Sequence, residues 1–130
     1  MDALELRARR EALGLDKADL ADVLGWKTAT VVECETAARV VPGWVASRLD
    51  ELEMARDTIA GVLEDSLPGD LVTYSTDAVF WAEWPEFRGI PAPVHRVAAV
   101  DALRSANWAG VRARIVPASP TDAGQGPSSA

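Results

Sequence analysis

Apolar residues recur at helical spacing along the first half of the chain, and short polar or glycine-containing breaks divide them into four predicted helices. These helices are expected over about residues 2–13, 17–24, 28–37 and 42–65. Gly14 suits the end of the first, because glycine readily adopts the left-handed conformation in which many helices end. Asp16 is a capping residue for the second helix, and Asp19 follows three positions later, as in a capping box.

The break between the second and third helices falls at Leu24-Gly25 and is tight. Two short helices joined by such a turn, with a glycine where φ must be positive, form a helix-turn-helix. This motif most often places its second helix in the major groove of DNA. The pattern therefore predicts a DNA-binding unit in which residues 28–37 read the sequence.

The fourth helix carries an apolar stripe that is longer than a compact helix-turn-helix needs. Its members recur at heptad-like spacing, and they are Val45, Leu49, Leu52, Ile59 and Leu63. The first half of this stripe should close the core of the helix-turn-helix. The second half, from about Met54, needs another partner.

Residues 66–116 predict a small β-α-α-β unit. Strands are expected over 71–75 and 111–116, with a helix after Thr76 and another over 94–107. About 50 residues are marginal for independent stability, and two strands alone make a poor sheet. We therefore expect this unit to pack against the fourth helix or against a second copy of the chain.

Two further features complete the C-terminal part. An aromatic cluster formed by Trp81, Trp84 and Phe87 is expected to be core or a homodimer interface rather than a surface for another partner. Residues 117–130 are rich in Pro, Gly, Ser and Ala and predict a disordered tail. The predicted domains are thus residues 1–65, residues 66–116 and the tail.

The charge of the chain complicates the DNA-binding interpretation. The net charge is −7, whereas affinity for phosphate comes largely from Lys and Arg. The acid is concentrated after the motif: residues 50–65 hold six acidic residues against Arg56, which gives a net charge of −5, while residues 1–49 have a net charge of −1. If the acidic segment points away from DNA, the reading face can still be basic.

No residue pattern points to catalysis, a metal or a cofactor. His95 is the only histidine and Cys34 the only cysteine, whereas metal sites and catalytic triads need several converging side chains. We expect Cys34 to be a small buried side chain. With no apolar signal segment and no membrane-spanning run, a single cysteine fits a cytoplasmic, reducing location.

The order of these residues resembles the lambda-repressor/Cro-like, or XRE-type, helix-turn-helix family over roughly residues 4–52. The residues that carry the resemblance are Arg7–Leu15, Leu20-Ala21, Leu24-Gly25, Val31, Glu35, Arg39 and Pro42. Asp16 departs from the pattern, because the family usually has Ser or Thr there. More loosely, the chain resembles small YdiL-like and anti-CRISPR-associated regulators.

The resemblance implies contacts to DNA from the early, outward part of the third helix. The candidates for base contact are Thr28, Ala29, Val32 and Glu33. Val32 suits a thymine methyl group, and Glu33 can accept from cytosine N4 but also repels phosphate. The candidates for phosphate contact form a basic rim of Lys17, Lys27, Arg39 and Arg10. The alternative is an ordinary solvated helix face.

The sequence thus predicts a mainly α protein with an N-terminal Cro-like helix-turn-helix, a long fourth helix and a small β-α-α-β unit. The predicted function is sequence-specific binding of double-stranded DNA by a transcriptional repressor. It is expected to act as a homodimer on an inverted repeat, through the long helix and residues 66–116, and without a small-molecule effector. The alternative is a protein-interaction module, such as an antitoxin or inhibitor, whose helix-turn-helix has lost DNA contact.

Overall fold

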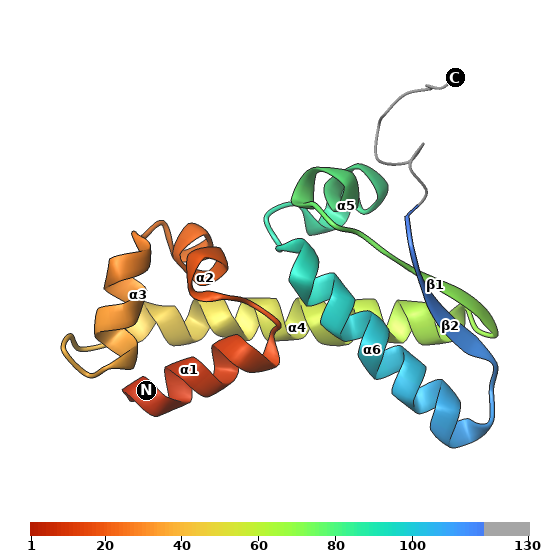
Figure 1. Ribbon diagram of the computed structural model, residues 1–130, viewed down its shortest axis with the longest axis horizontal. Helices are drawn as coiled ribbons and strands as arrows, with labels where there is room; N and C mark the ends of the chain where they lie inside the picture. The colour runs from red at the N-terminus through yellow and green to blue at the C-terminus, as the bar shows by residue number, and fades with distance from the viewer. Residues whose placement is uncertain (119–130) are drawn as a thin grey trace.

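The computed structural model describes residues 1–118, which are mainly helical with one small sheet (Figure 1). In chain order the elements are α1 (Ala3–Ala12), α2 (Lys17–Leu24), α3 (Thr28–Glu35), α4 (Gly43–Asp65), β1 (Gly69–Thr73), α5 (Asp77–Glu83), the 3₁₀ helix η1 (Pro85–Phe87), α6 (Ala92–Ala109) and β2 (Ala113–Pro117). This order confirms the predicted fold class. All but the first two residues of the predicted tail lie outside the described residues.

Capping hydrogen bonds and residues with positive φ set where the helices of the N-terminal half begin and end. Asp16 accepts a hydrogen bond from the backbone N–H of Asp19 at 2.7 Å, and Asp19 accepts one from Asp16 at 3.0 Å, so the predicted capping box is present. Gly25 ends α2 in the left-handed conformation, with φ 71°. The third helix is shorter than predicted, because the Thr36 hydroxyl donates to the Val32 carbonyl and Ala37 takes a φ of 64°.

A first core lies between α1, α2, α3 and the first half of α4. Its largest fully buried members are Leu6, Leu13, Leu20, Val31, Val45, Leu49 and Leu52. Val94 of α6 also belongs to this core. The start of α6 therefore packs directly on the helix-turn-helix.

Gly14 marks the closest approach between α6 and the loop that joins α1 to α2. Its φ is +74°, and a Cβ atom there would lie 2.7 Å from Cγ2 of Val97 and 3.3 Å from the carbonyl oxygen of Pro93. Only glycine fits both this conformation and this contact. Because α6 contacts both halves of the chain, the predicted boundary at residues 65 and 66 stays a prediction.

A second core lies between the second half of α4, α6 and the sheet. Ile59 and Leu63 of α4 are buried there, and α6 crosses α4 over this region (Figure 1). The partner that the second half of the stripe needs is thus present within the same chain. Of the two expected alternatives, packing of residues 66–116 against the fourth helix is the one observed, so Ile59 and Leu63 do not need a second copy.

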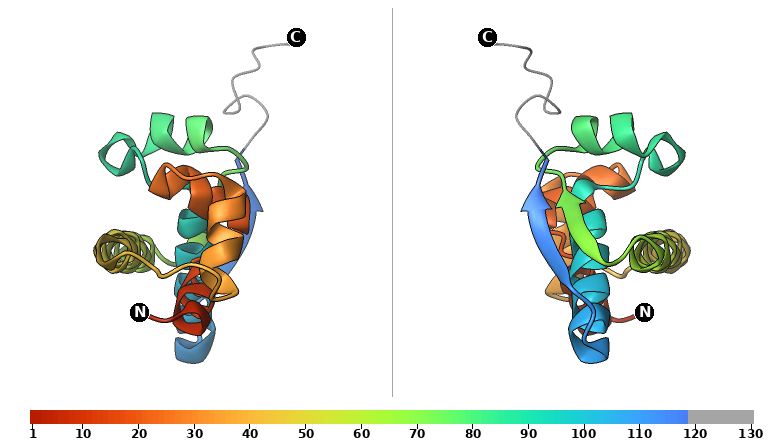
Figure 2. Two further views of the ribbon diagram at one scale, coloured as in Figure 1. Left: turned by 90° about the vertical axis from the view of Figure 1, so that its left-hand side faces the viewer. Right: turned by 90° about the vertical axis from the view of Figure 1, so that its right-hand side faces the viewer.

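The sheet consists of β1 and β2, which lie side by side and parallel, with α4 to one side (Figure 2). The register pairs Gly69 with Ala113 and Thr73 with Pro117. Parallel strands need a crossover connection, and α5, η1 and α6 supply it. Leu71, at the centre of β1, is fully buried against the second core.

The aromatic cluster packs around a buried histidine. The His95 ring is fully buried, and its centroid lies 5.0–5.2 Å from those of Tyr74, Phe80 and Trp84. Within residues 1–118 neither ring nitrogen of His95 has a hydrogen-bond partner. Trp81, Trp84 and Phe87 are partly buried and pack against the second core, which supports the core alternative for this cluster.

Candidate nucleic-acid interface

The candidate interface is the outward face of α3. Val31 and Cys34 are fully buried and anchor the opposite side of this helix in the first core. Cys34 is buried as predicted, and burial raises the pKa of its thiol. Because α3 is anchored on one side only, its other side is presented to solvent.

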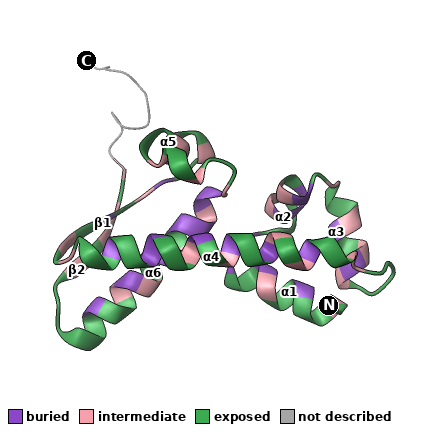
Figure 3. Ribbon diagram, turned by 180° about the vertical axis from the view of Figure 1, so that it is seen from behind, coloured by how far each residue is buried: buried purple, intermediate pink, exposed green. Residues whose placement is uncertain are grey.

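The predicted base-contact residues lie together on this outward face. Thr28, Ala29 and Val32 are exposed, and Glu33 is half-buried. Thr28 and Val32 are one helical turn apart, so their side chains are neighbours. Figure 3 shows this helix at one end of the molecule.

Two aromatic side chains hold the turn before α3 against the start of α4. Trp26 lies in the turn, and its ring packs edge-on to that of Trp44 with centroids 5.6 Å apart. Sequence reasoning missed this pair, because no periodic pattern relates a turn residue to one 18 positions later. The contact helps to fix the angle at which α3 leaves the turn.

Glu33 and Arg39 form an ion pair at the end of α3. The Nε and Nη2 atoms of Arg39 both lie 2.8 Å from Oε1 of Glu33. The chain turns back after α3, and the backbone N–H of Arg39 donates to the Glu33 carbonyl at 3.1 Å. One predicted base contact and one predicted phosphate contact are therefore paired with each other.

Arg10 differs from the other predicted phosphate contacts because its guanidinium is buried. Its Nε and Nη2 donate to the Glu35 carboxylate at 2.7 and 3.0 Å, and its Nη1 donates to the Leu15 carbonyl at 2.9 Å. The hydrogen bonds to Glu35 raise the pKa of Arg10. This ion pair joins α1 to α3, so Arg10 has a structural role and does not reach the outward face.

The remaining predicted phosphate contacts are placed differently. Lys17 is the first residue of α2 and Lys27 precedes α3, and both are exposed. Within residues 1–118 neither lysine forms an ion pair, so both ammonium groups are free to meet a phosphate. Lys17 and Lys27 are thus unpaired cations at the starts of α2 and α3.

Most of the acidic segment of the chain lies along α4, which runs away from α3 to the opposite end of the molecule (Figure 1). Near α1, Nη2 of Arg9 lies 2.7 Å from Asp50 and 2.7 Å from Glu53. These contacts partly neutralise the acid closest to the helix-turn-helix. Sequence reasoning missed this role of Arg9, because the partners lie more than 40 positions away.

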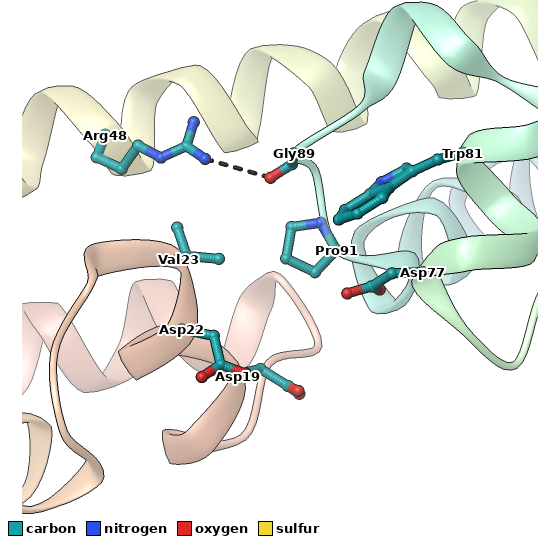
Figure 4. A pocket seen from close by; sticks show the side chains of 8 residues that line it. All are labelled: Asp19, Asp22, Val23, Arg48, Asp77, Trp81, Gly89 and Pro91. Atoms are coloured by element: carbon teal, nitrogen blue, oxygen red, sulfur yellow. Dashed lines mark hydrogen bonds between the residues drawn. The ribbon is translucent and has the colours of Figure 1, made fainter.

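A second group of acids lies on the side of α2 that faces the C-terminal half. Asp19, Asp22 and Asp77 line a cleft of about 300 Å³ together with Arg48, which donates to the Gly89 carbonyl at 3.2 Å (Figure 4). Asp19 completes the capping box of α2 by accepting from the Asp16 N–H at 3.0 Å, and Asp77 accepts from the Ala92 N–H at 2.7 Å at the start of α6. Burial raises the pKa of Asp19. The capping bonds give Asp19 and Asp77 structural roles.

The family comparison agrees with this geometry. Residues 3–58 match a family model described as a helix-turn-helix domain. No curated protein matches the chain. Among the described residues, no helix combines the length and the apolar character that crossing a membrane requires. Domains of the matched kind are typically DNA-binding modules of regulators, and the match over residues 3–58 supports an XRE-like helix-turn-helix family for the N-terminal part of this chain.

Proposed function

We propose that this protein is a sequence-specific transcriptional regulator that binds an inverted repeat as a homodimer and represses by excluding RNA polymerase. The observation that carries the proposal is the outward face of α3, which is anchored by Val31 and Cys34, together with two exposed, unpaired lysines at the starts of α2 and α3. A helix of this kind fits the major groove, where base pairs can be distinguished by their edges.

The exposed side chains of α3 favour a particular kind of contact. Ala29 and Val32 are apolar and small enough to meet thymine methyl groups, and the Thr28 hydroxyl can donate to or accept from a base edge. Lys17 and Lys27 then contact phosphates on either side of the groove. Specificity in this proposal comes from α3, and the lysines set its position on the duplex.

In this proposal the Glu33–Arg39 ion pair offsets the negative charge of Glu33 at the interface. In the free protein Arg39 neutralises Glu33, which limits repulsion of the DNA backbone. On a suitable site Arg39 moves to a phosphate, and the freed Glu33 carboxylate accepts from cytosine N4. On a site without that cytosine, the move of Arg39 to a phosphate leaves the Glu33 carboxylate unpaired, so binding to that site is disfavoured.

The test is a selection from randomised DNA with the wild type and two variants. We expect the wild type to enrich a motif with two inverted half-sites, with centres about 10–10.5 bp apart or a multiple of this spacing. Thr28→Ala should relax the preference at one position of each half-site. Lys17→Ala should weaken binding to all sequences alike and flatten its salt dependence. Thr58→Ala, at an exposed threonine of α4, is the matched control and should select the wild-type motif.

A second candidate function is supported by the composition of α3. The helix itself, TATVVECE, contains no basic residue, and its outward face carries Glu33, whereas Glu35 is buried against Arg10. Such a face suits a protein partner as well as DNA, as in an antitoxin or inhibitor. If the wild type enriches no motif, and Thr28→Ala and Lys17→Ala bind DNA as it does, this interaction-module function replaces the first.

A further inference from the structure

We propose that two copies of this chain associate through the exposed face of α6, which pairs antiparallel with the same face of a second copy. This proposal rests on the proposed function, which requires a dimer but does not say where the two copies meet. The second half of α4, from which a dimer was expected, is covered by α6 of the same chain.

The outer face of α6 exposes two large apolar side chains among polar ones. Trp108 is 93% exposed near the C-terminal end of the helix, and Val100 is 41% exposed. This end of α6 runs past α4 and is not covered by it (Figure 1). A hollow beside Trp108 is lined by Asp101, Arg104 and Ser105. The exposed Trp108 ring beside this hollow is apolar area that a second copy can cover.

Four residues of this face form a seam with the spacing of a helix pair. Val97, Asp101, Arg104 and Trp108 follow one another at intervals of four, three and four residues. This is the spacing of the contact positions in a coiled coil. Arg104 and Trp108 are exposed, whereas Asp101 is half-buried and Val97 is half-buried beside Gly14, so a partner helix can reach only the part of Val97 that the α1–α2 loop leaves uncovered.

The seam is complementary to itself when the two helices are antiparallel. If the twofold axis passes between residues 102 and 103, Asp101 lies opposite Arg104 of the partner subunit, and Arg104 lies opposite the partner's Asp101. In the same register Trp108 covers Val97 of the partner subunit, and Val97 is covered by the partner's Trp108. Such a two-way match is what a closed twofold dimer requires.

Two observations strengthen the charge argument. Within residues 1–118 neither Asp101 nor Arg104 has an ion-pair partner, although they are only three residues apart on one helix. Shifting the pairing by one heptad in either direction separates them: one shift places Val97 opposite the partner's Asp101, and the other places Arg104 opposite the partner's Trp108. Only the central register matches charge with charge and apolar with apolar.

The exposed side of α4 is a poorer candidate for the same role. It carries the exposed apolar residues Met54 and Val62, but these lie within the acidic segment 50–65. Two copies of this side would bring like charges together, which is unfavourable. The self-complementary surface is therefore the one on α6.

The experiment measures the mass of the full-length protein in solution by light scattering at micromolar concentration. We expect the wild type to have twice the mass of the 13.9 kDa chain. Asp101→Arg and Arg104→Asp each place like charges opposite one another and should raise the dissociation constant of the dimer by roughly 100-fold or more. The double variant Asp101→Arg/Arg104→Asp restores both pairs and should be a dimer again. An equimolar mixture of the two single variants should form a heterodimer, because every pair across the seam is then opposite in charge.

The control is Arg96→Asp, a charge reversal at an exposed residue of α6 outside the seam, which should remain dimeric. Circular dichroism melting of each variant shows whether it is folded. The seam is wrong if both single variants stay dimeric, or if the double variant and the mixture stay monomeric. Those results do not test the dimer of the proposed function, which is tested by the mass of the wild type. A monomeric wild type overturns the seam and the dimer together. Motif selection by monomeric variants on single half-sites tests DNA binding separately.

Discussion

At the scale of single residues, two buried polar groups differ in whether they have hydrogen-bond partners. The Arg10 guanidinium is satisfied by Glu35 and by the Leu15 carbonyl, whereas the His95 ring lies among aromatic rings. A buried ion pair is strongly destabilising when one partner is removed, because the other charge is left without compensation. A buried neutral histidine becomes more destabilising when it takes up a proton, because burial disfavours the charged form.

Glu35→Ala should therefore lower the free energy of unfolding by about 3 kcal/mol, since it leaves the Arg10 charge buried and unpaired. Urea denaturation at neutral pH measures the change. The matched control is Glu51→Ala, which removes an exposed partner of Arg48 and should cost less than about 0.5 kcal/mol. Equal losses in the two variants would contradict a structural role for Arg10.

His95 should make the protein less stable in mild acid. Burial, with a smaller contribution from the Arg96 charge, lowers the pKa of His95 from 6.5 to about 4. The unfolded chain therefore binds this proton more readily, so stability is complete above pH 6.5 and decreases as the pH falls towards 4. The expected loss is about 3 kcal/mol. It is measured as the difference in urea stability between the wild type and His95→Phe, which cannot titrate; parallel pH profiles for the two proteins would exclude this role.

At the scale of elements, the short connections decide how helices meet. Gly14 and Gly25 both have positive φ, but only Gly14 touches another element. Alanine at either position is strained by the backbone conformation. At Gly14 its Cβ atom must also displace Val97.

Gly14→Ala should therefore destabilise the protein by roughly 1–2 kcal/mol more than Gly25→Ala. Thermal and urea unfolding of both variants measure the difference, and Gly25→Ala isolates the backbone strain. Combining Gly14→Ala with Val97→Ala should recover part of the loss, because the contacting methyl group is gone. A Gly14→Ala variant no less stable than Gly25→Ala would show that α6 does not press on this loop.

The same scale explains what could be predicted from sequence. The α2–turn–α3 unit was predictable because its signals, Asp16, Asp19 and Gly25, act within a few residues. The Arg10–Glu35 and Arg9–Glu53 pairs were not, since a charge pattern does not show which distant residues meet. The partner of Ile59 and Leu63 was left open for the same reason: an apolar stripe predicts burial but not what covers it. The outward face of α3 was predicted from anchors on the opposite side of a short helix.

At the scale of the whole molecule, α6 joins the two cores. Val94 belongs to the first core, whereas Ala98, Ala99 and Ala102 belong to the second. A rigid helix that is part of both cores makes it difficult for one to unfold alone. The predicted division into two domains therefore has a testable consequence.

We expect the two cores to unfold in one cooperative transition. Amide hydrogen exchange under native conditions measures this, because Leu20 in α2 and Leu71 in β1 should then exchange with the same opening free energy. Val94→Ala should lower both values together, by about 1–3 kcal/mol. Opening free energies that differ widely, with only the first core sensitive to Val94→Ala, would show two independent domains.

A helix that touches the DNA-reading unit at one end and carries the proposed seam at the other also bears on operator geometry. The seam centre lies about eight residues from Val94, or roughly 12 Å along the axis of α6. In a dimer joined in this way, the two α3 helices are connected through the rigid α6 helices and not through flexible linkers. Such a dimer should require a fixed spacing between half-sites. Inserting one base pair moves the half-sites apart and rotates one around the duplex, and a rigid connection cannot follow either change.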